Sequence, residues 1–134
     1  MVERETTDGT RIARLLSSEI HGHERGVLGR LSVVDARSDV EPSVSGTFAY
    51  GVDLDCDGGV ERLADVFVHP DRSHVEFRIA PATAATAAES RGLRVRPKAV
   101  DPPRTLVFVE NGAEVKRVLS VIRAVATERI DQSG

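Results

Sequence analysis

The sequence predicts a single α+β domain over residues 1–134, in which helices cover mainly one face of a mostly antiparallel sheet of about six strands. Apolar residues recur at helical spacing near both ends of the chain, and the middle alternates apolar and polar residues between turn-forming residues. An Ala-rich segment separates the middle strands from two later ones. The expected order of elements is therefore α-β-β-β-β-α-β-β-α.

The first helix is expected to begin near Thr7 or Asp8, to run for about 12 to 14 residues and to end at Gly22. A strand is expected at Val27–Asp35, where apolar and polar residues alternate, followed by a polar, flexible linker over Ala36–Gly46. The buried stripe of the first helix consists of Ile12, Leu15, Leu16 and Ile20.

The middle of the chain is predicted to form two hairpins that share a central strand, Val60–Val68. In the first hairpin the preceding strand is Thr47–Leu54, and the turn Asp55–Gly59 pairs Leu54 with Val60. This register gives one mostly apolar face and one polar face.

The second hairpin is predicted to turn at Pro70–Ser73, which pairs Val66 with Phe77 and Asp65 with Arg78. Both registers bury the same even-numbered residues of the central strand, because side chains alternate between the two faces of a sheet. Agreement between two separate turns is the strongest structural argument in the sequence.

A short Ala-rich helix is expected over Ala82–Arg91, because Pro81 suits its first position and Gly92 its end. It has no large apolar side chain, so it can bury little area. Strands are expected at Leu93–Arg96 and Thr105–Glu110, the second being interior because it is apolar on both faces.

The last helix is predicted to start with a capping box formed by Asn111 and Glu114 and to cover the sheet. Residues 1–6 and 131–134 are expected to be disordered tails. The apolar stripe of this helix is Val115, Val118, Leu119, Ile122, Val125, Ala126 and Ile130.

Composition limits the classes of function. The formal net charge is −3, which gives no overall attraction to nucleic acid or to acidic membranes. Four Phe, one Tyr and no Trp leave few platforms on which bases or sugars could stack. The single cysteine excludes an internal disulfide, and no long apolar run appears, so we expect a cytoplasmic protein. The preference for Arg over Lys is compatible with a salt-adapted organism.

One motif has a defined chemical use. Asp53, Asp55 and Asp57 followed by Gly58 match the start of a calcium loop, although alanine stands at the twelfth position, where a bidentate acid is expected. In the predicted register Asp53 stands opposite Glu61, so four carboxylates would crowd one hairpin end, and a cation would offset their repulsion. The alternative is an acidic surface turn whose Asp-Gly pair supplies the hairpin geometry.

Two histidines flank the second turn. The predicted register makes His69 and His74 face each other on the polar side, where two imidazoles could bind zinc or nickel. Asp71 is a candidate third ligand, and His21 or His23 could reach the site only if the first helix ends nearby. The alternative, which we favour, is a pair of exposed histidines beside a surface turn.

The densest basic run includes Arg94, Arg96 and Lys98, which would share one face of a strand and could contact RNA phosphates. No aromatic residue lies between them and the net charge is negative. A solvated outer face is therefore the expectation, and nucleic acid is not an expected partner.

The sequence contains no recognisable catalytic constellation, so we expect a small binding or adaptor domain without enzymatic activity. Phe67 falls on the polar face between Asp65 and His69, and the Ala-rich helix carries little apolar surface, so both are candidates for a subunit or partner contact. We expect a homodimer, or a domain that binds a protein or peptide partner. The alternatives are a calcium module at the acidic turn and RNA binding through the basic run.

Overall fold

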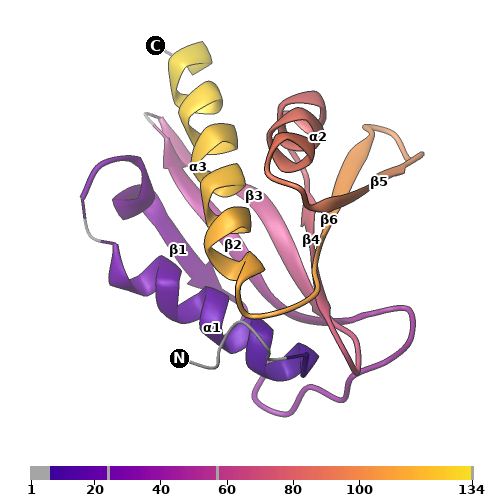
Figure 1. The fold of residues 1–134 in the computed structure, drawn as a ribbon. Helices are drawn as coiled ribbons and strands as arrows, with labels where there is room; N and C mark the ends of the chain where they lie inside the picture. Colours follow the sequence, from indigo (N-terminus) through magenta and orange to yellow (C-terminus); the bar gives the residue numbers. More distant parts are fainter. Residues whose placement is uncertain (1–6, 24, 57, 134) are drawn as a thin grey trace.

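The computed structural model describes residues 7–23, 25–56 and 58–133 and confirms the α+β class and the element order. Within these residues, six antiparallel strands form one sheet in the order β1-β2-β3-β4-β6-β5. The three α-helices lie on one side of the sheet (Figure 1). The elements are α1 (Gly9–Gly22), the 3-10 helix η2 (Val27–Arg30), β1 (Leu31–Val34), β2 (Thr47–Cys56), β3 (Gly59–Val68), β4 (Ser73–Phe77), α2 (Pro81–Ser90), β5 (Arg94–Lys98), β6 (Arg104–Val109) and α3 (Glu114–Ser133).

Helix α1 starts and packs as its sequence pattern predicts. The Asp8 side chain accepts a hydrogen bond from the Arg11 backbone N–H, at 3.1 Å, and so caps the first turn. Two buried hydrogen bonds fix the helix to the sheet: the Tyr50 hydroxyl donates to the Ala13 carbonyl and the Ser73 hydroxyl to the Gly9 carbonyl, each at 2.7 Å. The stripe that faces the core includes the fully buried Ile12, Leu16 and Ile20.

The capping box at the start of α3 is confirmed. The side chain of Asn111 accepts from the Glu114 N–H at 3.1 Å, and the Glu114 carboxylate accepts from the Glu110 N–H at 2.8 Å. The Ala-rich helix α2 packs beside α3 (Figure 1) with Ala84 and Ala88 fully buried, so its small side chains allow a close approach between elements.

Three predicted boundaries are wrong. Residues 27–30 form the 3-10 helix η2, so the strand predicted from Val27 begins at Leu31; backbone hydrogen bonds from the Gly29 N–H to the Arg25 and Gly26 carbonyls close this turn. Strand β4 begins at Ser73, a residue that was predicted to belong to the turn Pro70–Ser73. The tail predicted from residue 131 is helical as far as Ser133, because α3 continues to that residue. Residues 1–6 and Gly134 lie outside the described residues.

Both predicted hairpin registers are wrong, because both turns are shorter than expected. Strands β2 and β3 stay paired up to Cys56 and Gly59, which sets Leu54 opposite Glu61 instead of Val60. Two irregularities within β2 and β3 then shift the register along the hairpin. In the second hairpin the His69 N–H bonds to the Arg72 carbonyl at 2.8 Å and closes a tight turn.

The tight second turn moves β4 by two residues relative to the prediction, so Val66 pairs with Val75 and Asp65 with Glu76, where Phe77 and Arg78 were expected. A shift of two residues keeps every side chain on the same face of the sheet. The predicted burial of Ala64, Val66 and Val68 is therefore confirmed even though their partners differ. The prediction is wrong for the first half of the strand, because Val60 is exposed and Arg62 is only half-buried and bound to Asp53.

The core lies between the sheet and the helices. The helix-facing side of the sheet presents branched apolar residues from β2, β3, β4 and β6, which pack against α1, α2 and α3. We call the opposite side, which none of the described helices covers, the open face (Figure 1).

Candidate functional site

The open face carries a group of polar and aromatic side chains from β2, β3, β4, β5 and β6. Strand pairing orders these side chains into three rows that run across the sheet. The aromatic row is Phe48, Phe67, His74 and Phe108, and ends at Arg94. The middle row is Gly51, Asp65, Glu76, Leu106 and Arg96. The third row consists of two separate pairs, Asp53 with Arg62 and Arg104 with Lys98.

A single guanidinium organises the carboxylates on the β1–β3 half of the open face. Arg62 contacts Asp53, Asp65 and Asp35, each at 2.7 Å, through different nitrogen atoms. Burial lowers the pKa of Arg62, but the three hydrogen bonds outweigh it, so the net pKa is raised. Gly51 makes room for this side chain, because a Cβ atom there would lie 2.5 Å from the Arg62 Cζ.

On the β5–β6 half of the open face the roles are reversed, because bases surround a carboxylate. Glu76, which is 3% exposed, is bound by Arg104 at 2.7 Å and by Lys98 at 3.2 Å. Burial raises the pKa of Glu76, but the hydrogen bonds from these two bases outweigh it and hold the pKa below its ordinary value. Asp65 lies directly opposite Glu76 and is bound by Arg62 and Arg78. Each buried carboxylate is thus held by two bases, which offsets the repulsion between the two acids.

The aromatic row is continuous across four strands. Ring centroids are 5.9 Å apart for Phe48 and Phe67, 4.8 Å for Phe67 and His74, and 5.5 Å for His74 and Phe108. Arg72 lies over the Phe108 ring at 4.2 Å. Phe67 is on the open face, as the sequence predicted, and is half-buried.

His69 and His74 face each other, as predicted, but the expectation that they are exposed is wrong: they are 5% and 4% exposed. Nδ1 of His69 lies 2.8 Å from the Val44 carbonyl oxygen, and Nε2 of His69 lies 2.8 Å from Nδ1 of His74. A carbonyl oxygen only accepts, so Nδ1 of His69 donates. In the neutral pair Nδ1–H of His74 then donates to Nε2 of His69.

This pair holds the β1–β2 loop against the sheet. Gly46 has φ +98°, and a Cβ atom there would lie 3.0 Å from Cε1 of His74. Burial lowers the pKa of His74 to about 4, with a further lowering by His69. Among the described residues, no group of three or more His, Cys, Asp or Glu side chains could hold a metal ion, so Asp71, His21 and His23 do not complete a site.

The structure does not assemble the predicted calcium ligands that it describes. Asp53 lies opposite Arg62, whereas Glu61 lies opposite Leu54 and bonds to Arg129 of α3 at 2.6 Å. These two carboxylates therefore point to opposite faces of the sheet. Asp55 is exposed, and Asp57 lies outside the described residues.

Arg94, Arg96 and Lys98 share the open face, as alternate residues of β5 should. Arg94 pairs with Glu110 at 3.3 Å and Lys98 with Glu76, while Arg96 has no ion pair within residues 7–23, 25–56 and 58–133. Two of the three charges are thus already neutralised. RNA binding through this run stays a prediction.

Most of the charged network on the open face, including Arg62, Glu76 and Arg104, was not predicted from the sequence. The alternation Arg104-x-Leu106-x-Phe108 could have placed β6 with one partly polar face, but nothing local indicates that β6 lies between β4 and β5.

No helix in the described part of the chain is both long and apolar enough to span a membrane. No curated protein and no solved structure matches the chain at a significant level of similarity. The sequence does match a family profile over residues 1–133, almost its whole length. The chain therefore belongs to DUF7993, a family of unknown function.

Proposed function

We propose that this protein is a cytoplasmic binding domain without enzymatic activity, and that it acts as a homodimer in which two open faces pack together. The observation that carries the proposal is that one face of the sheet has no helix on it and yet holds an ordered aromatic row and paired buried carboxylates. Sheets commonly bury such a face against a second sheet about 10 Å away.

The distribution of charge favours a second copy as the occupant. On the open face, the carboxylates Asp35 and Asp53 lie toward β1 and β2, whereas the bases Arg96, Lys98 and Arg104 lie toward β5 and β6. In a two-fold dimer each subunit contributes the same patch. An axis parallel to the strands would place each aromatic row over the partner's aromatic row and each basic half over an acidic half.

The paired charges also make this face suitable for burial. In the described part of the chain, no buried side-chain nitrogen or oxygen lacks a hydrogen-bond partner. Covering Asp65 and Glu76 with a partner would therefore not leave an unpaired buried carboxylate, which is the usual cost of burying charge. Phe67 and Phe48, both half-buried, would supply the apolar centre.

The absence of catalysis is part of the proposal. The two buried histidines hydrogen-bond to each other, and His69 also donates to the Val44 carbonyl. Within the described residues neither imidazole hydrogen-bonds to a Ser, Thr or Cys side chain, which is the contact that an activated nucleophile requires.

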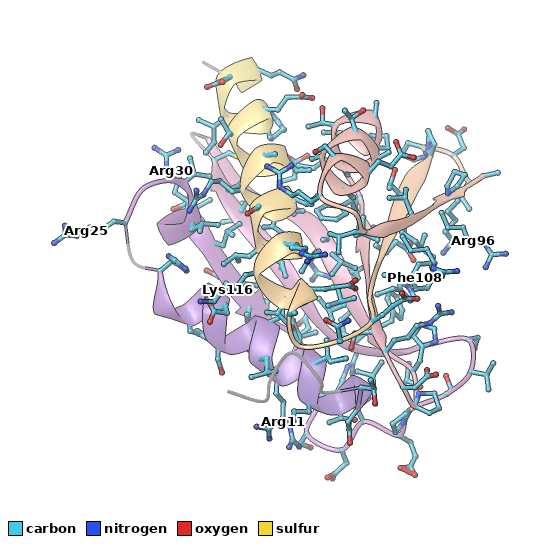
Figure 2. The ribbon with its side chains drawn as sticks, viewed as in Figure 1. Arg11, Arg25, Arg30, Arg96, Phe108 and Lys116 are labelled. Carbon is cyan, nitrogen blue, oxygen red and sulfur yellow. The ribbon has the colours of Figure 1, made fainter. Side chains whose placement is uncertain are left out.

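Sedimentation velocity at micromolar concentration tests the homodimer. We expect a species with twice the mass of the 14.5 kDa chain. Arg96→Glu and Phe67→Ser should each weaken association by about tenfold or more, because both side chains would lie in the contact. Lys116→Glu is the matched control, since it makes the same change of charge on α3, in the helix layer, away from Arg96 on β5 (Figure 2). A monomer throughout the micromolar range would refute the homodimer.

A further inference from the structure

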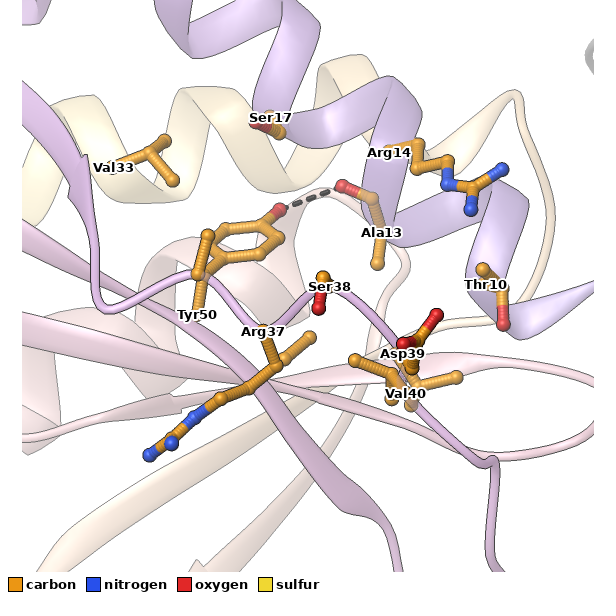
Figure 3. Close-up of a pocket in the computed structure, with 13 residues that line it drawn as sticks. Thr10, Ala13, Arg14, Ser17, Val33, Arg37, Ser38, Asp39, Val40 and Tyr50 are labelled. Carbon is orange, nitrogen blue, oxygen red and sulfur yellow. Dashed lines mark hydrogen bonds between the residues drawn. The ribbon is translucent and has the colours of Figure 1, made fainter.

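A cavity of about 310 Å³ lies on the helix side of the sheet, between α1, β2 and the segment 36–40 that follows β1 (Figure 3). Its volume is at the low end of the roughly 300–1,000 Å³ found for small-molecule sites, so it suits a small ligand. The cavity lies apart from the rows of the open face, although Arg37, which lines it, also lies over the Phe48 ring at 5.1 Å.

The floor of the cavity is apolar. It includes the ring of Tyr50 and the side chains of Ala13 and Val33 (Figure 3). Ala49 is a further apolar residue that lines the cavity. The Tyr50 hydroxyl is committed to the Ala13 carbonyl at 2.7 Å, and burial raises the pKa of this hydroxyl, so Tyr50 presents its ring and not a free polar group. This floor is suited to an aliphatic or aromatic group.

The rim of the cavity is polar and offers unused hydrogen-bonding groups. Thr10, Arg14 and Ser17 come from one stripe of α1, since they are spaced four and three residues apart. Ser38 and Asp39 come from the segment 36–40, on the opposite side of the cavity (Figure 3). Within the part of the chain that the structure describes, none of these five side chains has a hydrogen-bond or ion-pair partner.

The rim contains both signs of charge. Arg14 and Asp39 both line this cavity, and their side chains form no ion pair with each other. In Figure 3 the Asp39 carboxylate points toward α1, on the side of the cavity where Thr10 and Arg14 lie. A ligand with only a negative charge would meet Asp39 unfavourably, and a purely apolar ligand would leave both charges unused.

We propose that this cavity binds a free α-amino acid with an apolar side chain. The ligand carboxylate pairs with Arg14, whose planar guanidinium suits bidentate contact with a carboxylate. The ligand ammonium pairs with Asp39, the rim hydroxyls supply further hydrogen bonds, and the side chain lies against the ring of Tyr50. This ligand class uses the floor and both rim charges together.

Amide NMR of the full chain, titrated separately with L-leucine, L-valine and L-phenylalanine, tests the proposal. We expect saturable shifts at Ala13, Tyr50 and Asp39 with at least one of the three. N-acetyl-L-leucine lacks the ammonium and L-leucinamide lacks the carboxylate, so each should bind about tenfold or more weakly than L-leucine, because each loses a charged hydrogen bond. Glycine should also bind more weakly, since it has no side chain for the floor.

Two variants separate the charge contacts. Arg14→Gln and Asp39→Asn should each weaken amino-acid binding by about tenfold, while Arg30→Gln, an exposed change outside the cavity, should leave it unchanged. Both rim residues are exposed, and spectra that match the wild type away from the cavity would verify that the variants fold. Absence of saturable shifts with all three amino acids, or unchanged affinity in both rim variants, would overturn the proposal.

Discussion

The buried histidine pair should make the stability of this protein depend on pH in a calculable way. The pKa of His74 is about 4 in the folded chain, against an ordinary value of 6.5, because the ring is buried and lies near His69, Arg72 and Lys98. Between these pH values the unfolded chain binds a proton that the folded chain does not. The contribution of His74 to stability is therefore fully present above pH 6.5 and is lost as the pH falls toward 4.

The magnitude follows from these two pKa values. Integrating the difference in bound protons between pH 7 and pH 5 gives a loss of about 2 kcal/mol in the free energy of unfolding. Protonation of His74 is unfavourable because the charged ring is buried and is repelled by Arg72 and Lys98. It nevertheless leaves the hydrogen bond from Nδ1 of His74 to His69 in place. The loss should therefore be gradual across this window and should not coincide with unfolding of the loop at Val44.

Urea unfolding of the wild type at pH 7 and pH 5 measures this loss. The double variant His69→Gln, His74→Phe removes both imidazoles while keeping a donor for the Val44 carbonyl and an aromatic ring in the row. Its stability should fall by about 2 kcal/mol less than that of the wild type over the same interval. His21→Gln, a change at an exposed histidine of α1, is the control and should behave as the wild type.

An NMR titration of the His74 imidazole provides a direct check, with an expected midpoint near 4. The wild type and the variants contain the same carboxylates. The effect of carboxylate protonation near pH 5 on stability therefore cancels when the proteins are compared. Equal loss of stability in the wild type and the double variant, or a midpoint near 6.5, would show that the pair is not desolvated as described.

Two further predictions concern the packing around the two sites. Tyr50→Phe removes the buried hydrogen bond to the Ala13 carbonyl and should lower the free energy of unfolding by about 1 kcal/mol in urea denaturation; an unchanged value would mean that this bond does not fix α1 to β2. Gly46→Ala and Gly58→Ala both place alanine at φ +98°, but only the first also meets the imidazoles of His69 and His74. Gly46→Ala should therefore cost about 1 kcal/mol more than Gly58→Ala in the same assay, and equal costs would argue against close packing of the loop on the histidines.

The elements that local patterns specify were predicted correctly. Helix α1 has its start encoded by Asp8 and its buried face by Ile12, Leu16 and Ile20, and α3 has its start encoded by Asn111 and Glu114. These signals lie within one or two turns of the residues that they order. For the same reason the sequence correctly placed Ala64, Val66 and Val68 on the helix-facing side of β3, since alternation along a strand is a local property. It placed Glu61 and Arg62 on the wrong faces, because the shorter first turn changes the pairing of this part of β3 by one residue.

Details that depend on the turns were predicted incorrectly. The sequence allowed longer turns at Asp55–Gly59 and Pro70–Ser73, and the structure closes both more tightly. A change of one residue in the first turn moved Glu61 away from Asp53 and toward Arg129, which removed the predicted acidic cluster. A change of two residues in the second turn preserved the faces but replaced Arg78 with Glu76 as the neighbour of Asp65.

The sequence by itself therefore determined the order of the elements, the starts of the long helices and the buried side of β3 from Ala64 to Val68. Only the tertiary structure decided that β6 lies between β4 and β5, which brings Lys98 and Arg104 to Glu76, and that segment 36–40 lies across from α1, which forms the cavity at Tyr50. The physical reason is the distance along the chain over which each kind of interaction acts. Capping and periodicity act between neighbours in the chain, whereas both sites are built from residues that come together only after turn lengths, strand irregularities and sheet order are fixed.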